Sequence, residues 1–177
     1  SFQDKEIIKF ANDNDVDFLA LSFISSSEDV LEVNDLLINI GNDHLQIISK
    51  IENNFAIDDI DNIIKVSDGI IIDRKDLGVE VPLEKIPGIQ KRIISKCHAD
   101  GIISIIATDL LSSVNSFDYP TRAEVSDIAN AVLDGTDSIM LSDETTIGKK
   151  PIVTLKLLES ILKAVEQDID YDYMLEI

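Results

Sequence analysis

Five short apolar runs constrain the fold of this chain more than any other feature. They are rich in Ile and Leu, nearly continuous, and lie at Phe18–Ile24, Leu45–Ile51, Gly69–Ile72, Ile102–Thr108 and Ser138–Ser142. Strands lack alternation of apolar and polar residues when both faces of their sheet are buried, as in parallel sheets. The runs therefore predict five parallel strands.

The stretches between these runs have the spacing of amphipathic helices. In Glu28–Ile40, apolar residues recur on one helical face, and Ser26 or Ser27 precedes them as a candidate N-cap. Pro151 is placed to open the last helix, to about Gln167, in the favoured first turn. Similar spacing predicts helices at residues 4–12, 57–64, 89–97 and 125–133. The pattern is one helix followed by five βα units.

This alternation predicts an α/β fold with a parallel sheet and right-handed crossover connections. Two architectures have this pattern. One is an open doubly wound sheet, which five strands complete, and the other is a (β/α)8 barrel, of which five strands form only a part. No linker or low-complexity run divides the chain, so residues 1–177 are expected to form a single segment.

The charge of the chain narrows the range of its partners. Asp and Glu number 34 against 15 Lys and Arg, for a formal net charge of −19. Nucleic acids and anionic membranes are bound by clustered cations, so we expect neither as a partner. A single cysteine, Cys97, excludes a disulfide framework, and nothing resembles a signal peptide or a membrane span. We expect a soluble cytoplasmic protein that takes a phosphorylated substrate only together with a divalent cation.

Polar residues follow the predicted strands at the ends where an α/β protein holds its active site. The second run closes with Lys50 and Glu52, the third is followed by 73–78, and the fourth ends at Thr108. Lys50 and Glu52 are two residues apart, so on a strand they point the same way. A charged lysine at the end of a buried strand costs free energy unless its charge is paired or has a role in function. A structural pair of Lys50 with Glu52 or Asp76 is therefore the alternative to a functional role.

Glu52 and Asp76 come at the ends of neighbouring predicted strands. Two converging carboxylates suit an oxygen-preferring divalent ion such as Mg²⁺, and solvated acids are the alternative. Residues 76–78 are candidates to start a short helix whose free N–H groups face an anion. Thr108 offers a hydroxyl for hydrogen bonding or proton relay.

Longer motifs closely resemble those of the pyruvate kinase family, in the family's order and spacing across essentially the whole chain. They are IISKIEN at 47–53, SDGI at 67–70, DLGVEVP at 76–82, AT at 107–108, PTRAE at 120–124, SDIANAVLDG at 126–135 and IMLS at 139–142. The resemblance implies that the five strands are the last five of the family's (β/α)8 barrel. It also implies that the family's first three strands, its inserted lid domain and its C-terminal regulatory domain are absent from residues 1–177.

The resemblance implies the family's reaction. This is transfer of a phosphoryl group from phosphoenolpyruvate to ADP in glycolysis, which gives pyruvate and ATP, with Mg²⁺ or Mn²⁺ and usually K⁺. Carried over residue by residue, Glu52 and Asp76 would be the metal ligands. Lys50 would stabilise the transferring phosphoryl group and help to protonate the enolate. The cations would neutralise the substrate phosphate locally, as phosphoryl transfer requires.

The resemblance also implies how the substrate is held. Thr108 would contact the substrate carboxylate and lie on the proton route. The backbone N–H groups of Lys75 and Asp76, at a helix start, would bind that carboxylate. Ser22 and Phe23 match the family's Ser-Phe pair, which lines the site.

The chain departs from the family pattern near these positions. Where the family has Ala-Arg-Gly-Asp, the chain has Asp-Arg-Lys-Asp at 73–76, and Asp109 and Asp143 replace a family Gln and Gly. Lys75 in place of glycine adds a side chain beside the substrate pocket and disfavours a positive φ. We expect these added charges to weaken substrate binding.

The resemblance covers only part of the family's site. In the family, the arginine that grips the substrate phosphate, most K⁺ ligands and much of the nucleotide contact come from the absent strands. We therefore expect the isolated chain to be inactive or very weakly active, and to act with a complementing barrel half or as a homo-oligomer. Two alternatives are a non-catalytic paralogue that binds or regulates a partner and a metal-dependent lyase of pyruvate-like acids.

Overall fold

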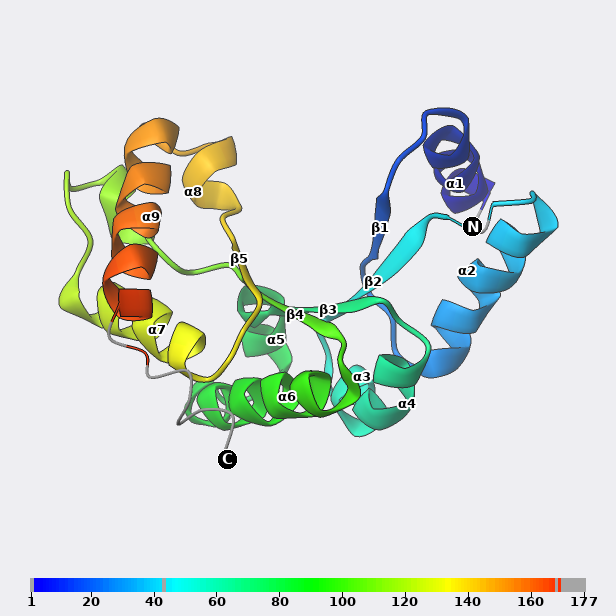
Figure 1. Cartoon of the computed structure of the whole chain (residues 1–177), viewed down its shortest axis with the longest axis horizontal. Coiled ribbons are helices and arrows are strands. Elements are labelled where there is room, and N and C mark those ends of the chain that lie inside the picture. Colours follow the sequence, from blue (N-terminus) through cyan, green and yellow to red (C-terminus); the bar gives the residue numbers. More distant parts are fainter. Residues whose placement is uncertain (1, 43, 168, 170–177) are drawn as a thin grey trace. The chain divides into compact units, whose positions relative to one another are not determined.

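The computed structural model describes residues 2–42, 44–167 and 169, so most of the last ten residues of the predicted segment lie outside the described part. Five strands form one sheet in chain order, β1-β2-β3-β4-β5 (Figure 1). They are β1 (Phe18–Leu21), β2 (Gln46–Ile51), β3 (Gly69–Asp73), β4 (Ile103–Ala107) and β5 (Ser138–Met140). Strand β2 pairs in parallel with both β1 and β3, which confirms the predicted parallel α/β sheet.

Helices connect the strands, most of them at the predicted places. They are α1 (Phe2–Asp13), α2 (Ser27–Asn39), α3 (Asn54–Asp58), α4 (Ile60–Lys65), α5 (Arg74–Glu80), α6 (Ile86–Asp100), α7 (Arg122–Leu133), α8 (Asp143–Thr146) and α9 (Pro151–Gln167), with 3-10 turns at Leu83–Lys85 and Ser112–Asn115. Helix α8 is a short helix that was not predicted. Helix α2 has Ser26 at its N-cap, and α9 begins at Pro151, as predicted. In the described part of the chain, no helix has both the length and the apolar character needed to cross a membrane.

Several predicted elements differ from the structure, and two of the differences have a clear local geometry. The helix expected at 57–64 is split into α3 and α4, because Asp59 between them leaves helical geometry with φ −100° and ψ 14°. The Asp59 carboxylate instead accepts the N–H of Ser27 at 2.7 Å. The first strand, expected to reach Ile24, ends at Leu21, and Phe23 two residues later has a φ of +59°, which is incompatible with an extended strand.

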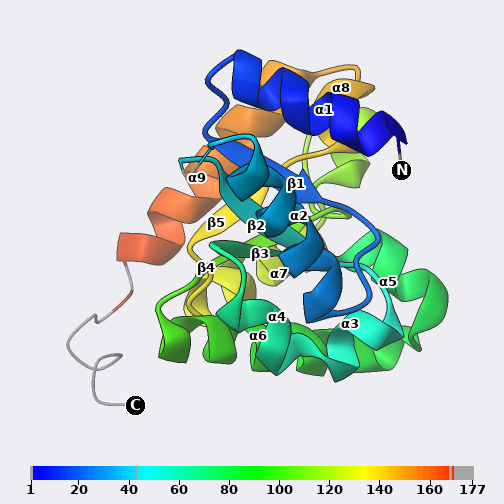
Figure 2. The same ribbon diagram turned by 90° about the vertical axis from the view of Figure 1, so that its right-hand side faces the viewer.

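The chain divides into two compact units, residues 1–105 and 106–177. In the first unit, α2 packs against α4 and α4 against α6, which forms a helical layer beside the strands (Figure 2). All five residues of β3 are buried. The fully buried isoleucines of this unit are Ile47, Ile51, Ile63, Ile64, Ile70, Ile72, Ile93 and Ile94. A strand covered on both faces needs apolar side chains at successive positions, which explains the continuous runs in the sequence.

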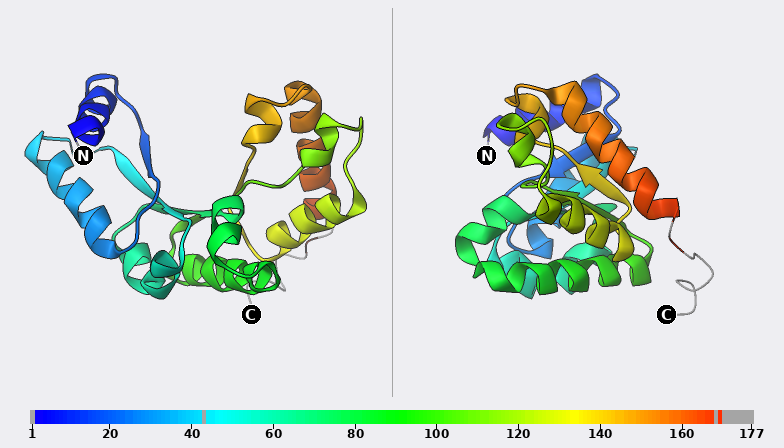
Figure 3. Two further views of the ribbon diagram at one scale, coloured as in Figure 1. Left: turned by 180° about the vertical axis from the view of Figure 1, so that it is seen from behind. Right: turned by 90° about the vertical axis from the view of Figure 1, so that its left-hand side faces the viewer.

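In the second unit, α7 and α8 both pack against α9 (Figure 3). Helix α7 begins with a capping box, in which Glu124 accepts the Thr121 N–H at 2.7 Å and the Thr121 hydroxyl accepts the Glu124 N–H at 3.2 Å. Glu124 also accepts the N–H of Ser113 at 2.8 Å and the hydroxyl of Ser113. One carboxylate thus ties the start of α7 to the preceding 3-10 turn.

These contacts predict a pH dependence of stability. Burial raises the pKa of Glu124, but the hydrogen bonds from Ser113 and Thr121 outweigh it, so the pKa lies below its ordinary value. The ionised form therefore stabilises the folded chain above the pKa of an unfolded glutamate, and this contribution disappears as the pH falls through the folded pKa. Glu124→Gln is expected to lower the free energy of unfolding at pH 7 by about 1 kcal/mol and to reduce its fall with acid.

Urea unfolding followed by circular dichroism at neutral and acidic pH measures both effects. Glu166→Gln on α9 is the matched control, because this exposed side chain undergoes the same change of charge. Equal pH dependence in the two variants would contradict the assigned role of Glu124.

Candidate functional site

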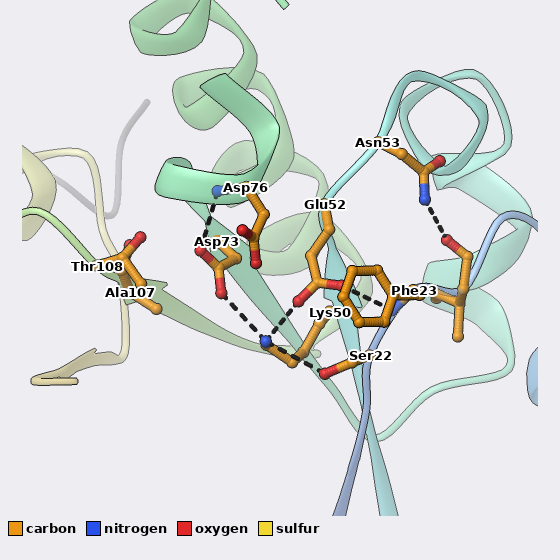
Figure 4. Close-up of polar contacts among 10 residues, drawn as sticks. Ser22, Phe23, Lys50, Glu52, Asn53, Asp73, Asp76, Ala107 and Thr108 are labelled. Atoms are coloured by element: carbon orange, nitrogen blue, oxygen red, sulfur yellow. Dashed lines mark hydrogen bonds and ion pairs between the residues drawn. The ribbon is translucent and has the colours of Figure 1, made fainter. Parts of the chain in front are cut away.

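Three carboxylates and one lysine gather where β2 and β3 end. Lys50 lies on β2 and Glu52 directly follows it, while Asp73 ends β3 and Asp76 lies in the first turn of α5. The parallel register places Lys50 beside Ile71, so the residues at the carboxyl ends of the two strands meet. Carboxylate oxygens of Glu52, Asp73 and Asp76 lie within 4.8 Å of one another (Figure 4).

Lys50 is the centre of the polar contacts in this cluster. Its ammonium group contacts Glu52 Oε1, lies 3.1 Å from Asp73 Oδ2, and donates to Ser22 Oγ at 3.3 Å (Figure 4). Burial lowers the pKa of Lys50, but its hydrogen bonds to Glu52 and Asp73 and their negative charges outweigh it, so the pKa lies above its ordinary value. Lys50 therefore keeps its positive charge throughout the physiological range.

Glu52 is held in place by the loop after β1. The backbone N–H of Phe23 donates to Glu52 Oε2 at 2.6 Å (Figure 4). The positive φ of Phe23 is uncommon for a non-glycine residue and gives the chain the local turn in which this N–H faces the carboxylate. Phe23 is 77% exposed, and its observed contribution to the cluster comes from its backbone.

Asp73 was not among the residues singled out from the sequence. Its carboxylate caps α5, with Oδ1 at 3.5 Å from the Asp76 N–H, while Oδ2 faces Lys50. Helix α5 consequently begins at Arg74, two residues before the predicted start. The sequence does contain a signal that could have identified Asp73: it is an acid directly after a fully buried apolar run.

Lys75 and Asp76 occupy the first turn of α5, where the sequence predicted a helix start facing an anion. The Asp76 N–H is directed at Asp73, and its predicted role in binding a substrate carboxylate stays a prediction. Lys75 is exposed, and it is absent from the described residues with positive φ. Lys75 therefore does not need a positive φ. Its replacement of the family glycine causes none of the backbone strain that a positive φ would bring.

Thr108 belongs to the second unit and directly follows β4. It is buried, its hydroxyl donates to the Ala107 carbonyl at 2.6 Å, and it has a φ of +68° (Figure 4). Asp109 follows with a φ of +53°. Two successive non-glycine residues in the left-handed region cost about 1–3 kcal/mol each, and such strain clusters at functional sites. The roles predicted for Thr108 in catalysis and substrate binding stay predictions.

The donor set of the cluster fits a hard divalent cation. All three acids offer oxygen, the ligand atom that Mg²⁺ and Mn²⁺ prefer. None of these three grouped residues is a cysteine or a histidine. Glu52 and Asp73 are almost completely buried, at 3% and 4% exposure. Buried carboxylates in excess over the one paired ammonium favour a further positive charge in the same place.

Comparison with known proteins identifies the family. A family model described as the barrel domain of pyruvate kinase matches residues 1–155. The chain belongs to the pyruvate kinase family. This confirms the resemblance found in the motifs, and it assigns the five-stranded α/β sheet to part of that family's barrel.

The chain is similar over nearly its whole length to curated pyruvate kinases. It is 47% identical to that of Clostridium perfringens over 173 residues, which cover 98% of this chain and 36% of that protein. It is 49% identical to that of Borreliella burgdorferi over 165 residues (93% and 35%), and 47% identical to that of Methanocaldococcus jannaschii over 164 residues (93% and 36%). The chain thus spans about a third of these relatives, and their names do not favour the lyase or the non-catalytic alternative.

Proposed function

We propose that the chain is a segment of a pyruvate kinase-type phosphotransferase and forms the cation-binding part of its active site. The reaction is phosphoryl transfer from phosphoenolpyruvate to ADP, giving pyruvate and ATP, and it requires the remaining strands of the barrel. The observation that carries the proposal is the cluster at the ends of β2 and β3, in which Lys50 is held among three carboxylates that lie within 4.8 Å of one another.

The residues of the cluster divide the work of charge neutralisation. Glu52 and Asp76 would hold Mg²⁺ or Mn²⁺, which supplies electrostatic stabilisation of the transferring phosphoryl group. Lys50 would present its positive charge to the same group and would help to protonate the enolate. The Phe23 N–H fixes the orientation of Glu52, and the Ser22 hydroxyl fixes that of Lys50.

Further parts of the proposal concern the rest of the site. Thr108, together with the N–H groups of Lys75 and Asp76, would bind the substrate carboxylate. A K⁺ requirement, a cytoplasmic location and assembly with a complementing barrel half or as a homo-oligomer belong to the same proposal. Residues 1–177 would form a single segment of the barrel domain.

A chimera tests the function directly. The chain replaces the matching segment of the Clostridium perfringens pyruvate kinase, and pyruvate release from phosphoenolpyruvate and ADP is measured with Mg²⁺ and K⁺. We expect measurable activity. Lys50→Met in the chimera should lower kcat by about 100-fold or more, because the positive charge that stabilises the transferring phosphoryl group is lost.

Lys65→Met is the matched control, since this exposed lysine lies at the end of α4. Its activity should equal that of the unmodified chimera. A folded chimera without activity, or one in which Lys50→Met keeps full activity, would contradict the proposed function.

A further inference from the structure

Besides its capping contact, Asp73 makes a contact with Lys50 that a helix cap does not require. Its Oδ1 faces the Asp76 N–H at 3.5 Å, at the outer limit of a hydrogen bond, so the capping contact is weak. Its Oδ2 lies 3.1 Å from the Lys50 ammonium, and the side chain is only 6% exposed. The same carboxylate is one of the three whose oxygens cluster within 4.8 Å. The Asp73 carboxylate therefore faces both the start of α5 and the charged cluster.

The three carboxylates and Lys50 together carry an excess of negative charge that a divalent cation would balance. Glu52, Asp73 and Asp76 carry three negative charges, and Lys50 carries one positive charge, which leaves two negative charges in a mostly buried place. A divalent cation brings the sum to zero. Without the Asp73 carboxylate, the same cation beside Lys50 would leave an excess positive charge.

Lys50 and a cation bound by Glu52 would compete for one carboxylate. Glu52 Oε2 already accepts the Phe23 N–H, and its Oε1 faces Lys50. A cation that draws on Glu52 therefore weakens the Lys50–Glu52 pair and repels the ammonium. The remaining polar contacts that the structure gives Lys50 are Asp73 and the neutral Ser22 hydroxyl.

We propose that Asp73 is a third carboxylate of the cation site and the residue that keeps Lys50 in the site when the cation draws on Glu52. The inference rests on the proposed cation site of Glu52 and Asp76. It assigns Asp73 as a positioning residue, and it explains why a buried acid is accommodated directly beside two others.

Two variants separate this role from capping. Asp73→Asn keeps the shape of the side chain and its capping oxygen but removes the charge, and Asp73→Ser keeps an N-cap residue without a carboxylate. Mn²⁺ alone is titrated into each variant by calorimetry, after circular dichroism has established that the variant is folded. We expect both to bind Mn²⁺ about 10–100-fold more weakly than the unmodified chain. Asp58→Asn, an exposed acid on α3, should leave the affinity unchanged.

The reactivity of Lys50 provides a second readout. Modification by trinitrobenzenesulfonate is located by peptide mass spectrometry, with and without Mg²⁺. In the unmodified chain, Mg²⁺ should change the rate at Lys50 by less than about twofold, because Asp73 retains the ammonium. In Asp73→Asn, Mg²⁺ should raise that rate severalfold, an effect that loss of a helix cap does not produce.

The outcomes distinguish this inference from the proposed function. If the unmodified chain binds Mn²⁺ and the folded Asp73 variants bind it equally well, the inference is overturned and the cation site of Glu52 and Asp76 stands. If the folded, unmodified chain does not bind Mn²⁺, the proposed cation site fails and the inference fails with it. Weaker binding together with Mg²⁺-dependent exposure of Lys50 supports both.

Discussion

Glu52→Gln is expected to weaken Mn²⁺ binding by more than about 100-fold, the largest effect of any single change in the cluster. Loss of residues that only support a metal ligand costs about 10–100-fold, and the loss of a charged ligand exceeds that range. Glutamine retains an oxygen that can accept the Phe23 N–H, whose distance to Glu52 Oε2 is 2.6 Å. The variant should therefore fold normally while losing the charge that holds a cation.

Calorimetry with Mn²⁺, in the absence and presence of oxalate as a mimic of enolpyruvate, measures this effect. The unmodified chain is expected to bind Mn²⁺ more tightly with oxalate, and Glu52→Gln should show no binding under either condition. Glu84→Gln is the matched control, since this exposed acid in the turn after α5 loses the same charge. Equal Mn²⁺ affinity in Glu52→Gln and Glu84→Gln would show that Glu52 is not a ligand of the cation.

Gly148→Ala is expected to cause the largest loss of stability, about 3 kcal/mol in the free energy of unfolding, at the upper end of the cost of overpacking. A Cβ at this position would lie 2.7 Å from Asn115 Oδ1 and closer still to the carbonyl oxygen of Glu144. Neither neighbour moves freely. Asn115 Oδ1 accepts the Lys149 N–H at 3.2 Å, and the Glu144 oxygen is part of the backbone of α8.

The damage should spread through Glu144. Its buried carboxylate accepts the N–H groups of Leu110 and Ser142, each at 3.0 Å, and so joins the segment after β4 to the segment after β5. Displacement of the α8 backbone would disturb both hydrogen bonds, and a buried N–H left without its acceptor costs about 1–3 kcal/mol.

Urea unfolding followed by circular dichroism measures the loss. Gly88→Ala is the matched control, because a Cβ there meets no atom within 4 Å and the residue lies inside α6. That change should raise the free energy of unfolding by about 0.5–1 kcal/mol, since alanine favours a helix more than glycine does. Equal stability of Gly148→Ala and the unmodified chain would show that the α8–α9 turn adapts to a side chain.

Local pattern was sufficient to predict the sheet and most helices. The continuous apolar runs predicted strands buried on both faces, and β3 has that burial at every residue. Pro151 and the Ser26 cap predicted helix starts correctly, because capping and φ preferences act within a few residues. The helix break at Asp59 was not evident, and the hydrogen bond from Ser27 to the Asp59 carboxylate spans 32 positions, which no local pattern contains.

Part of the site was predictable for the same reason. Lys50 and Glu52 are two residues apart at the end of a strand, so their proximity follows from strand geometry. Asp76 and the family motifs around it were also evident in the sequence. The motifs predicted the family, which the barrel-domain match confirms.

The place of Asp73 in the cluster depends on contacts between distant parts of the chain. Its distance to Lys50 is set by the parallel register of β2 and β3 and by the turn that starts α5. The orientation of Glu52 depends likewise on Phe23, which lies 29 positions earlier and adopts a positive φ. Sequence spacing determines which residues share a strand face, but only strand pairing brings charges from different strands together, and their balance then determines what the site can bind.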